Sequence, residues 1–176
     1  MCGIVAYIGK KPAAPLLLEG LKRLEYRGYD SAGVAVLDLQ GKLNLAKSVG
    51  RVRVLEELIE NRRGFDGTQG LAHTRWATHG GVTEANAHPH LDDLVKGHGI
   101  ALVHNGIIEN YASIKKYLLE KGHVFKSETD TEVLVHLVGE LYQGDLEKAV
   151  QAALREVAGA YAIACISEKE PGVLVV

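Results

Sequence analysis

The chain has only two cysteines, Cys2 and Cys165, among its 176 residues, which is too few for a disulfide framework. It lacks the roughly 18 consecutive apolar residues of a membrane-spanning helix, and it lacks the basic segment and apolar run of a secretory signal. A formal net charge of -2 gives no reason to expect nucleic acid or an anionic membrane as a partner. These absences predict a cytoplasmic protein whose cysteines act as thiols and whose chemistry concerns small molecules.

Hydrophobic residues make up 47% of the chain, enough for one globular domain with a substantial core. Short apolar runs alternate with segments of helical periodicity, which predicts an α+β domain. We expect strands at 3–9, 31–49 (a hairpin turning at 40–41), 68–74, 99–104, 159–167 and 172–176. We expect helices at 17–24, 54–59, 110–121, 130–142 and 145–156. The long polar loop before residue 99 is of a length that tends to be functional.

Cys2 occupies a position at which removal of Met1 would make it the amino terminus. It would then carry both a thiol and a free α-amine, and the amine could accept the thiol proton directly or through one water. Gly3 allows close backbone approach beside an attacking sulfur. We therefore favour a nucleophile over the alternative of a small buried hydrophobe, and we assign Cys165, inside the apolar run YAIACI, to the core.

The stretch AHTRWATHGG, residues 72–81, gathers an arginine, an indole, hydroxyls and two imidazoles at a strand end. Arg75 could hold a carboxylate through two parallel hydrogen bonds, although a loop arginine is often merely solvated. Trp76 could pack against the domain or cover a ligand. Gly80 and Gly81 would let such a loop close over a substrate.

Histidine is dense in one part of the chain, which raises the question of a metal site. Six histidines fall within this span: His73, His79, His88, His90, His98 and His104. Their spacing contains no His-Glu-x-x-His helix and no Cys-x-x-Cys pair. We therefore expect structural or hydrogen-bonding roles for most of them, and no metal or other cofactor.

Asn105 and Gly106, in VHNGIIEN, are expected just past a strand. An asparagine amide beside a glycine N–H supplies two donors that can converge on one oxygen, as an oxyanion hole requires, although Asn-Gly is also an ordinary turn signal. Asp130 follows Thr129, which with Glu132 matches the Ser/Thr-x-x-Glu capping box, so Asp130 should lie in the first helical turn. Its carboxylate could interact with the helix dipole or bind a ligand ammonium.

Together, MCGIV, LEYRGYDSAG, HTRWATHG, NAHPH, VHNGIIEN and SETDTE resemble the glutaminase domain of the glutamine–fructose-6-phosphate aminotransferase family, over nearly the whole chain. Other N-terminal-cysteine amidotransferases share the opening cysteine and an Asn-Gly pair, but LEYRGYDSAG and HTRWATHG are similar to the sugar-phosphate enzymes in particular. The resemblance implies an N-terminal-nucleophile hydrolase fold of four layers, αββα, with two stacked antiparallel sheets.

The same resemblance implies that Cys2 attacks the side-chain amide of L-glutamine, forming a thioester and releasing ammonia before water frees glutamate. Asn105 and Gly106 would stabilise the oxyanion. The implied substrate-binding residues are Arg75, Thr78 and His79 for the α-carboxylate, Asp130 for the α-ammonium, Trp76 on a closing loop, and Arg27 and Gly28 beside the nucleophile.

Members of this family continue into sugar-binding isomerase domains, which this chain does not resemble. We therefore expect residues 1–176 to be a glutaminase domain, truncated at its C-terminus, of a parent enzyme that is a homo-oligomer. In that enzyme the ammonia would serve the synthesis of glucosamine 6-phosphate from fructose 6-phosphate. Two alternatives stay open: another N-terminal-cysteine amidotransferase or amidase, and an inactive fragment that serves as an interaction module.

Overall fold

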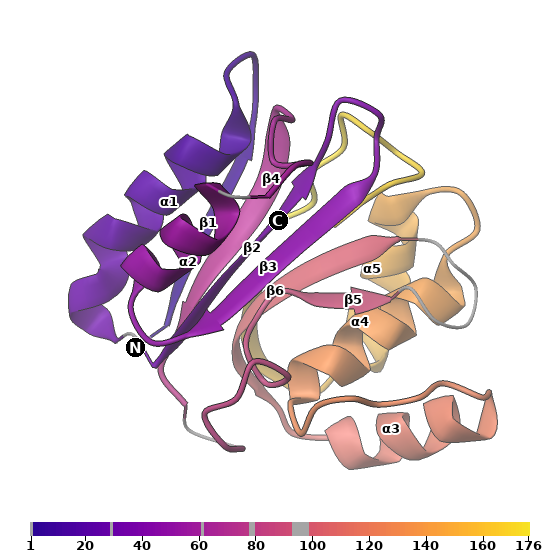
Figure 1. The fold of residues 1–176 in the computed structure, drawn as a ribbon. Helices are drawn as coiled ribbons and strands as arrows, with labels where there is room; N and C mark the ends of the chain where they lie inside the picture. Colours follow the sequence, from indigo (N-terminus) through magenta and orange to yellow (C-terminus); the bar gives the residue numbers. More distant parts are fainter. Residues whose placement is uncertain (1, 29, 61, 78–79, 93–98) are drawn as a thin grey trace.

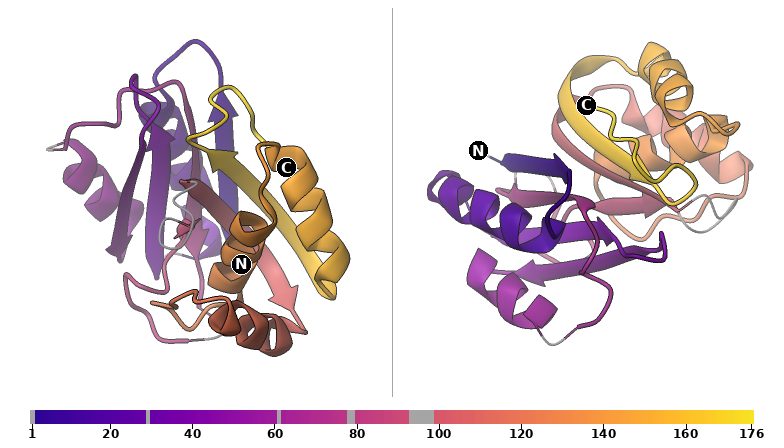
Figure 2. Two further views of the ribbon diagram at one scale, coloured as in Figure 1. Left: turned by 90° about the vertical axis from the view of Figure 1, so that its right-hand side faces the viewer. Right: turned by 90° about the horizontal axis from the view of Figure 1, so that it is seen from above.

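The computed structural model describes residues 2–28, 30–60, 62–77, 80–92 and 99–176, apart from the side chain of Arg27. Two antiparallel sheets lie face to face, and helices cover the outer side of each (Figures 1 and 2). This arrangement confirms the four-layer αββα architecture that the sequence predicts. Among the described residues, no helix combines the length and the apolar character needed to cross a membrane.

The first sheet has four strands in the order β1-β4-β2-β3. Its strands are β1 (Gly3–Ile8), β2 (Ser31–Leu37), β3 (Leu43–Val49) and β4 (Gln69–Arg75). Strands β2 and β3 form the expected hairpin, in which Gly41 adopts a φ of 77°. The covering helices are α1 (Ala13–Leu24), which continues into a 3-10 turn at Glu25–Arg27, and α2 (Val52–Glu60).

The second sheet has three strands in the order β5-β6-β7. They are β5 (His90–Asp92), β6 (Ile100–Ile108) and β7 (Gly159–Ser167). On its outer side, α4 (Asp130–Leu141) packs against β5 and β6, and α3 (Tyr111–Glu120) and α5 (Leu146–Glu156) pack against α4. All three helices lie where the sequence predicts them.

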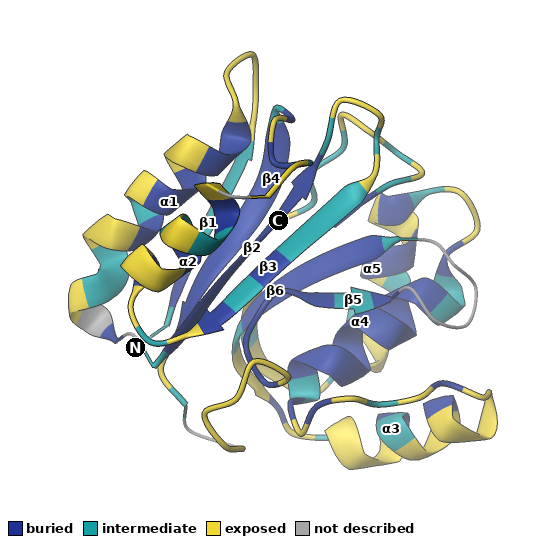
Figure 3. Ribbon diagram, viewed as in Figure 1, coloured by how far each residue is buried: buried dark blue, intermediate teal, exposed yellow. Residues whose placement is uncertain are grey.

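Alternation along the strands divides the core into layers. In β2, Val34 and Val36 pack against α1 and α2, whereas Ala35 and Leu37 join the cluster between the two sheets. Successive side chains of a strand point to opposite faces of the sheet. A strand that lies between two apolar layers must therefore carry apolar side chains on both of its faces. All of β2 and β4 is accordingly buried (Figure 3).

Three strand predictions need correction. The short edge strand β5 lies inside the segment expected to be a loop, because its three residues are too few to show an alternating pattern. Strand β6 runs four residues further than expected, since β7 pairs with it as far as Ile108.

Residues 172–176 form no strand, although Val175 makes one isolated bridge with Cys165. The side chain of Gln69 accepts a hydrogen bond from the Gly172 N–H and donates one to the Val173 carbonyl. These backbone groups are therefore occupied by a side chain instead of a neighbouring strand.

Candidate active site

A cavity of about 120 Å³ opens beside Cys2, at the point where the ends of β1 and β4 approach β6 and the start of α4. Six of the expected site residues line it: Cys2, Arg75, Trp76, Asn105, Gly106 and Asp130. They come from segments up to 128 residues apart (130 − 2) in the chain, so the fold brings them together. A cavity of this size admits only a small molecule.

Pairing between β1 and β4 places the nucleophile candidate. Gly3 pairs with Thr74, so Cys2 lies beside the end of β4. The Trp76 N–H donates to Cys2 Sγ over 3.3 Å, and Sγ lies 3.6 Å from the Trp76 carbonyl oxygen. A Cβ at position 3 would lie 2.8 Å from Leu24, so glycine there lets β1 approach α1 closely just behind the cysteine.

Asn105 is oriented by a buried histidine that sequence reasoning did not single out. Asn105 Nδ2 donates to the Cys2 carbonyl oxygen at 3.3 Å, and its Oδ1 lies 2.8 Å from His73 Nε2. The Cys2 carbonyl can only accept, which fixes the amide with Nδ2 toward Cys2. Burial lowers the pKa of His73 to about 4, so the ring is neutral near pH 7 and must carry its proton on Nε2.

Neutral buried histidines make stability fall in mild acid. Burial holds the pKa of His73 at about 4, and that of His88 also well below its ordinary 6.5. At about pH 7.5 both rings are mostly neutral in the folded and the unfolded chain, and as the pH falls toward 4 they gain protons mainly in the unfolded chain. Between about pH 7.5 and about pH 5, His73 alone should lower the free energy of unfolding by about 2 kcal/mol.

Urea denaturation at the two pH values measures this loss. Because burial causes it, the loss should be almost the same at low and high salt, unlike an effect of exposed ion pairs. His136, whose pKa is raised to about 9, contributes in the opposite direction over this range, so the net loss should be smaller than the sum for His73 and His88. Equal stability at both pH values would contradict neutral His73 and His88 rings in the folded chain.

Gly106 lies within β6, not just past a strand as expected, and it pairs with Tyr161 in β7. The alternative of an ordinary turn at Asn105-Gly106 is therefore wrong. The φ of Gly106 is +133°, and a Cβ there would lie 2.1 Å from the Ala160 carbonyl oxygen. Only glycine can hold this backbone conformation against β7, and the strand thereby continues along the cavity wall.

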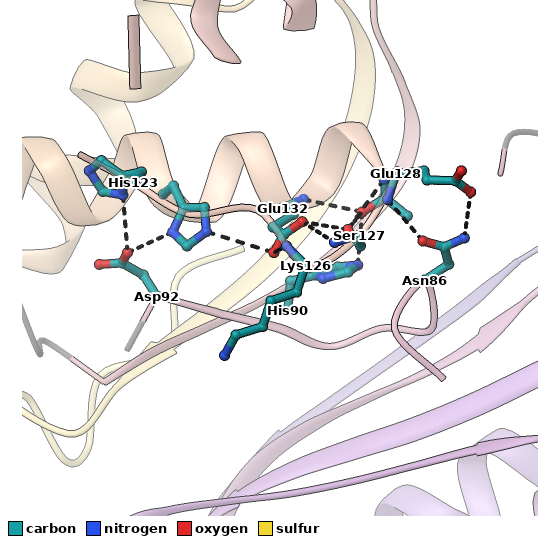
Figure 4. Close-up of polar contacts among 10 residues, drawn as sticks. Asn86, His90, Asp92, His123, Lys126, Ser127, Glu128 and Glu132 are labelled. Atoms are coloured by element: carbon teal, nitrogen blue, oxygen red, sulfur yellow. Dashed lines mark hydrogen bonds and ion pairs between the residues drawn. The ribbon is translucent and has the colours of Figure 1, made fainter. Parts of the chain in front are cut away.

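Arg75 ends β4 with its side chain buried, so it is not a solvated loop arginine. Its Nη1 donates to the Gly81 carbonyl oxygen at 3.1 Å. Two side chains hold Gly81 in turn. The Glu128 carboxylate accepts from the Gly81 N–H, and the Asn86 amide donates to the Gly81 carbonyl oxygen. Glu128 and Asn86 also contact each other (Figure 4). The guanidinium therefore faces both the cavity and the loop beside it.

Asp130 begins α4, as the sequence predicts. Its Oδ2 accepts from the Ile108 N–H at 2.9 Å, and its Oδ1 lies 3.8 Å from His104 Nδ1. Burial lowers the pKa of His104, so this ring does not supply a positive charge near pH 7. The carboxylate is thus anchored to β6 while it lines the cavity.

The predicted capping box is half formed. Thr129 Oγ1 accepts from the Glu132 N–H at 3.3 Å, as an N-cap should. The Glu132 carboxylate, however, accepts from the backbone N–H groups of Lys126 and Ser127 instead of that of Thr129. It therefore fixes the turn that leads into α4, including the backbone beside Glu128.

Trp76 is 54% exposed, which excludes a core role. A Cβ at Gly28 would lie 2.7 Å from its ring, so Gly28 makes room for the indole and does not itself line the cavity. Thr78, His79 and the side chain of Arg27 lie outside the described residues.

Sequence reasoning also missed a residue that shapes the loop after β4. Asp30 accepts from the Ala77 N–H, and its own N–H donates to the Arg75 carbonyl oxygen at 3.0 Å. The position of Asp30 just before a strand gave a weak signal, because an aspartate there is typical of any turn.

Comparison with known proteins gives a consistent result. A family model described as "Glutamine amidotransferase domain" matches residues 73–176. Two curated relatives are each a glutamine–fructose-6-phosphate aminotransferase (isomerizing), one from Chlorobaculum tepidum and one from Bacteroides thetaiotaomicron. Both are 55% identical to this chain, and the matches cover 100% and 97% of it, respectively. The chain spans only 29% and 28% of their lengths.

Two solved structures share the fold. The glutamine phosphoribosylpyrophosphate amidotransferase from B. subtilis matches 96% of this chain and 35% of its own, with a TM-score of 0.81 and 27% identity. A structure described as the allosteric regulatory enzyme of purine biosynthesis matches 96% of this chain and 36% of its own, with a TM-score of 0.82 and 28% identity. The fold is the N-terminal-nucleophile hydrolase fold that the sequence predicts.

Proposed function

We propose that this chain, which belongs to the glutamine amidotransferase domain family, hydrolyses the side-chain amide of L-glutamine to glutamate and ammonia. One observation carries the proposal: a thiol, an amide donor, a cation and an anion face one small cavity. Cys2, Asn105, Arg75 and Asp130 supply these groups in that order. A zwitterionic amide substrate requires this combination.

In the proposed reaction, removal of Met1 frees the α-amine of Cys2, which takes the thiol proton. Sγ then attacks the amide carbon of glutamine, and the oxygen becomes an oxyanion stabilised by Asn105 Nδ2 and the Gly106 N–H. The protonated α-amine returns its proton to the leaving nitrogen, so that ammonia departs and a thioester remains. Water, deprotonated by the same amine, attacks the thioester and releases glutamate and the thiol.

The substrate backbone would be held by opposite charges. Arg75 is the residue that we propose for the α-carboxylate, with Thr78 and His79, and Asp130 for the α-ammonium. Trp76, whose indole is exposed beside the cavity, would close over the substrate. Arg27 and Gly28 are proposed to flank the nucleophile.

Asp130→Asn should raise the KM for glutamine by about 10- to 100-fold, the scale of a lost hydrogen bond to a charged group. The asparagine can still accept from the Ile108 N–H, so the fold should survive. Glutaramate, which is glutamine without its α-amine, is the matched substrate. The variant should hydrolyse glutaramate as fast as the parent chain does, and an equal loss with both substrates would contradict an ammonium contact.

Arg75→Lys should weaken glutamine binding by about 2–3 kcal/mol, because a lysine cannot reproduce two parallel hydrogen bonds to a carboxylate. The loss should appear in the KM for glutamine in a steady-state glutaminase assay. Lys47→Arg, a substitution outside the cavity, serves as a control for general effects of exchanging cations. An unchanged KM for Arg75→Lys would remove Arg75 from this role.

The chain is also proposed to be part of a larger enzyme, because it spans less than a third of the curated relatives named above. In that enzyme isomerase domains would use the ammonia to make glucosamine 6-phosphate from fructose 6-phosphate, in a cytoplasmic homo-oligomer. Residues 1–176 would then belong to its glutaminase domain.

Ammonia release separates this function from the alternatives. The chain should release ammonia from L-glutamine much faster than from simple aliphatic amides, since only glutamine engages both charges. Equal rates would indicate a general amidase, and no release from either by a chain with a free Cys2 amine would indicate an interaction module.

A further inference from the structure

Three buried side chains outside the catalytic cavity gather where β5, α4 and the turn after α3 meet. They are Asp92, His123 and His136, here named the Asp92 cluster (Figure 4 labels Asp92 and His123). Their exposed fractions are 0%, 2% and 0%, and one ligand-type atom of each lies within 4.8 Å of the others. None of them lines the cavity beside Cys2.

The two imidazoles direct the same ring nitrogen at one carboxylate. Nδ1 of His136 lies 2.8 Å from Asp92 Oδ1, and Nδ1 of His123 lies 3.8 Å from the same oxygen, too far for a hydrogen bond. His123 Nδ1 and Asp92 Oδ2 are buried and have no hydrogen-bond partner among the described residues. A buried polar atom left unpaired costs about 1–3 kcal/mol, so a missing partner is indicated at this point.

Each imidazole also has a carboxylate behind it. His123 Nε2 lies 3.3 Å from Glu140 Oε2, and His136 Nε2 lies 3.8 Å from Glu132 Oε1. A carboxylate at the far nitrogen is the usual arrangement behind metal-bound histidines, where it fixes the tautomer and raises ligand basicity.

Three carboxylates around two imidazoles make this a site for positive charge. These carboxylates are Asp92 between the two rings, Glu140 behind His123 and Glu132 behind His136. A divalent cation between the two Nδ1 atoms would meet the same field and would also give partners to the unpaired atoms.

We propose that Asp92, His123 and His136 bind a divalent transition-metal ion, for which Zn²⁺ matches two imidazoles and one carboxylate. The ion would join the edge strand β5 to α4 and to the turn after α3, a structural role. The expectation of no metal rested on histidine spacing between 73 and 104, whereas His123 and His136 lie beyond that span.

The test titrates the purified, metal-free chain with Co²⁺ and then displaces the Co²⁺ with Zn²⁺, in a Cys2→Ala background that removes the half-buried Cys2 thiol as a competing ligand. We expect one Co²⁺ per chain with a visible spectrum that lacks thiolate-to-cobalt charge transfer, together with a higher melting temperature. His123→Gln should weaken binding at least about 100-fold, and Glu140→Gln about 10- to 100-fold. His90→Gln, two residues from Asp92 on β5, is the matched control and should bind as the parent does.

Several results would overturn the proposal: no stoichiometric binding, binding that survives His123→Gln, or an equal loss in His123→Gln and His90→Gln. Far-ultraviolet circular dichroism shows whether each variant is folded. If His123→Gln is not, Asp92→Asn takes its place, because its carboxamide keeps an acceptor for His136 and loses the charge that the metal requires.

Discussion

A Cys2→Ala variant should lose glutaminase activity by a factor on the order of 10⁶, because both steps of the proposed reaction pass through the sulfur. Its circular dichroism and melting temperature should stay close to those of the parent chain. Cys2 is only half buried, and the hydrogen bonds of its thiol within the described part of the chain go to backbone groups of Trp76, so little packing should be lost.

The second cysteine provides the matched control. Cys165 lies in β7 and is fully buried against the helices that cover the second sheet. Burial raises its pKa, so the side chain stays an unreactive thiol. Cys165→Ala should therefore lower stability somewhat and leave turnover per folded chain unchanged. If Cys165→Ala abolished turnover in a folded chain, or Cys2→Ala kept it, the nucleophile would have been assigned to the wrong residue.

Asn105→Ala should lower the kcat for glutamine by about 10²- to 10³-fold, the effect of removing one oxyanion-hole donor, or about 3–4 kcal/mol. The KM should change little, since the donor acts on charge that develops only in the transition state. The amide already points at Cys2, held between His73 and the Cys2 carbonyl.

An asparagine outside the cavity controls for general effects. Asn110 bonds the backbone at Glu156 and Ala158, and Asn110→Ala should cost stability without lowering kcat. Steady-state kinetics on the two variants distinguishes a loss of oxyanion stabilisation from a general effect of losing an asparagine. A loss confined to KM in Asn105→Ala would assign this residue to substrate binding instead of oxyanion stabilisation.

Much of the fold could be predicted from the sequence because its signals are local. The Gln40-Gly41 hairpin and the Thr129 cap of α4 each depend on residues a few positions apart. The start of α1 was less well predicted, since the helix begins at Ala13 and not at residue 17. Strand β5 and the extension of β6 could not be predicted, since both depend on pairing with distant segments.

The residues of the candidate site also fall into those that the sequence indicated and those that it could not. Residue type raised Cys2, Arg75 and Asp130 as candidates and the motif resemblance implied their roles, and the structure places all three at one cavity. The role of His73 could not be predicted, since a histidine in a strand shows no sign of the asparagine that it will orient 32 positions later. Asp30, Asn86 and Glu128 were missed for the same reason, because each acts through backbone groups of a loop.

The intact mass of the purified chain, before and after treatment with a diazoketone analogue of glutamine, tests the central claim most directly. We predict a chain that lacks Met1 and gains one adduct, located on Cys2 by peptide mapping and prevented by excess L-glutamine. An adduct on Cys165, or no adduct on a chain whose Cys2 amine is free, would contradict the assignment of Cys2 as an N-terminal nucleophile.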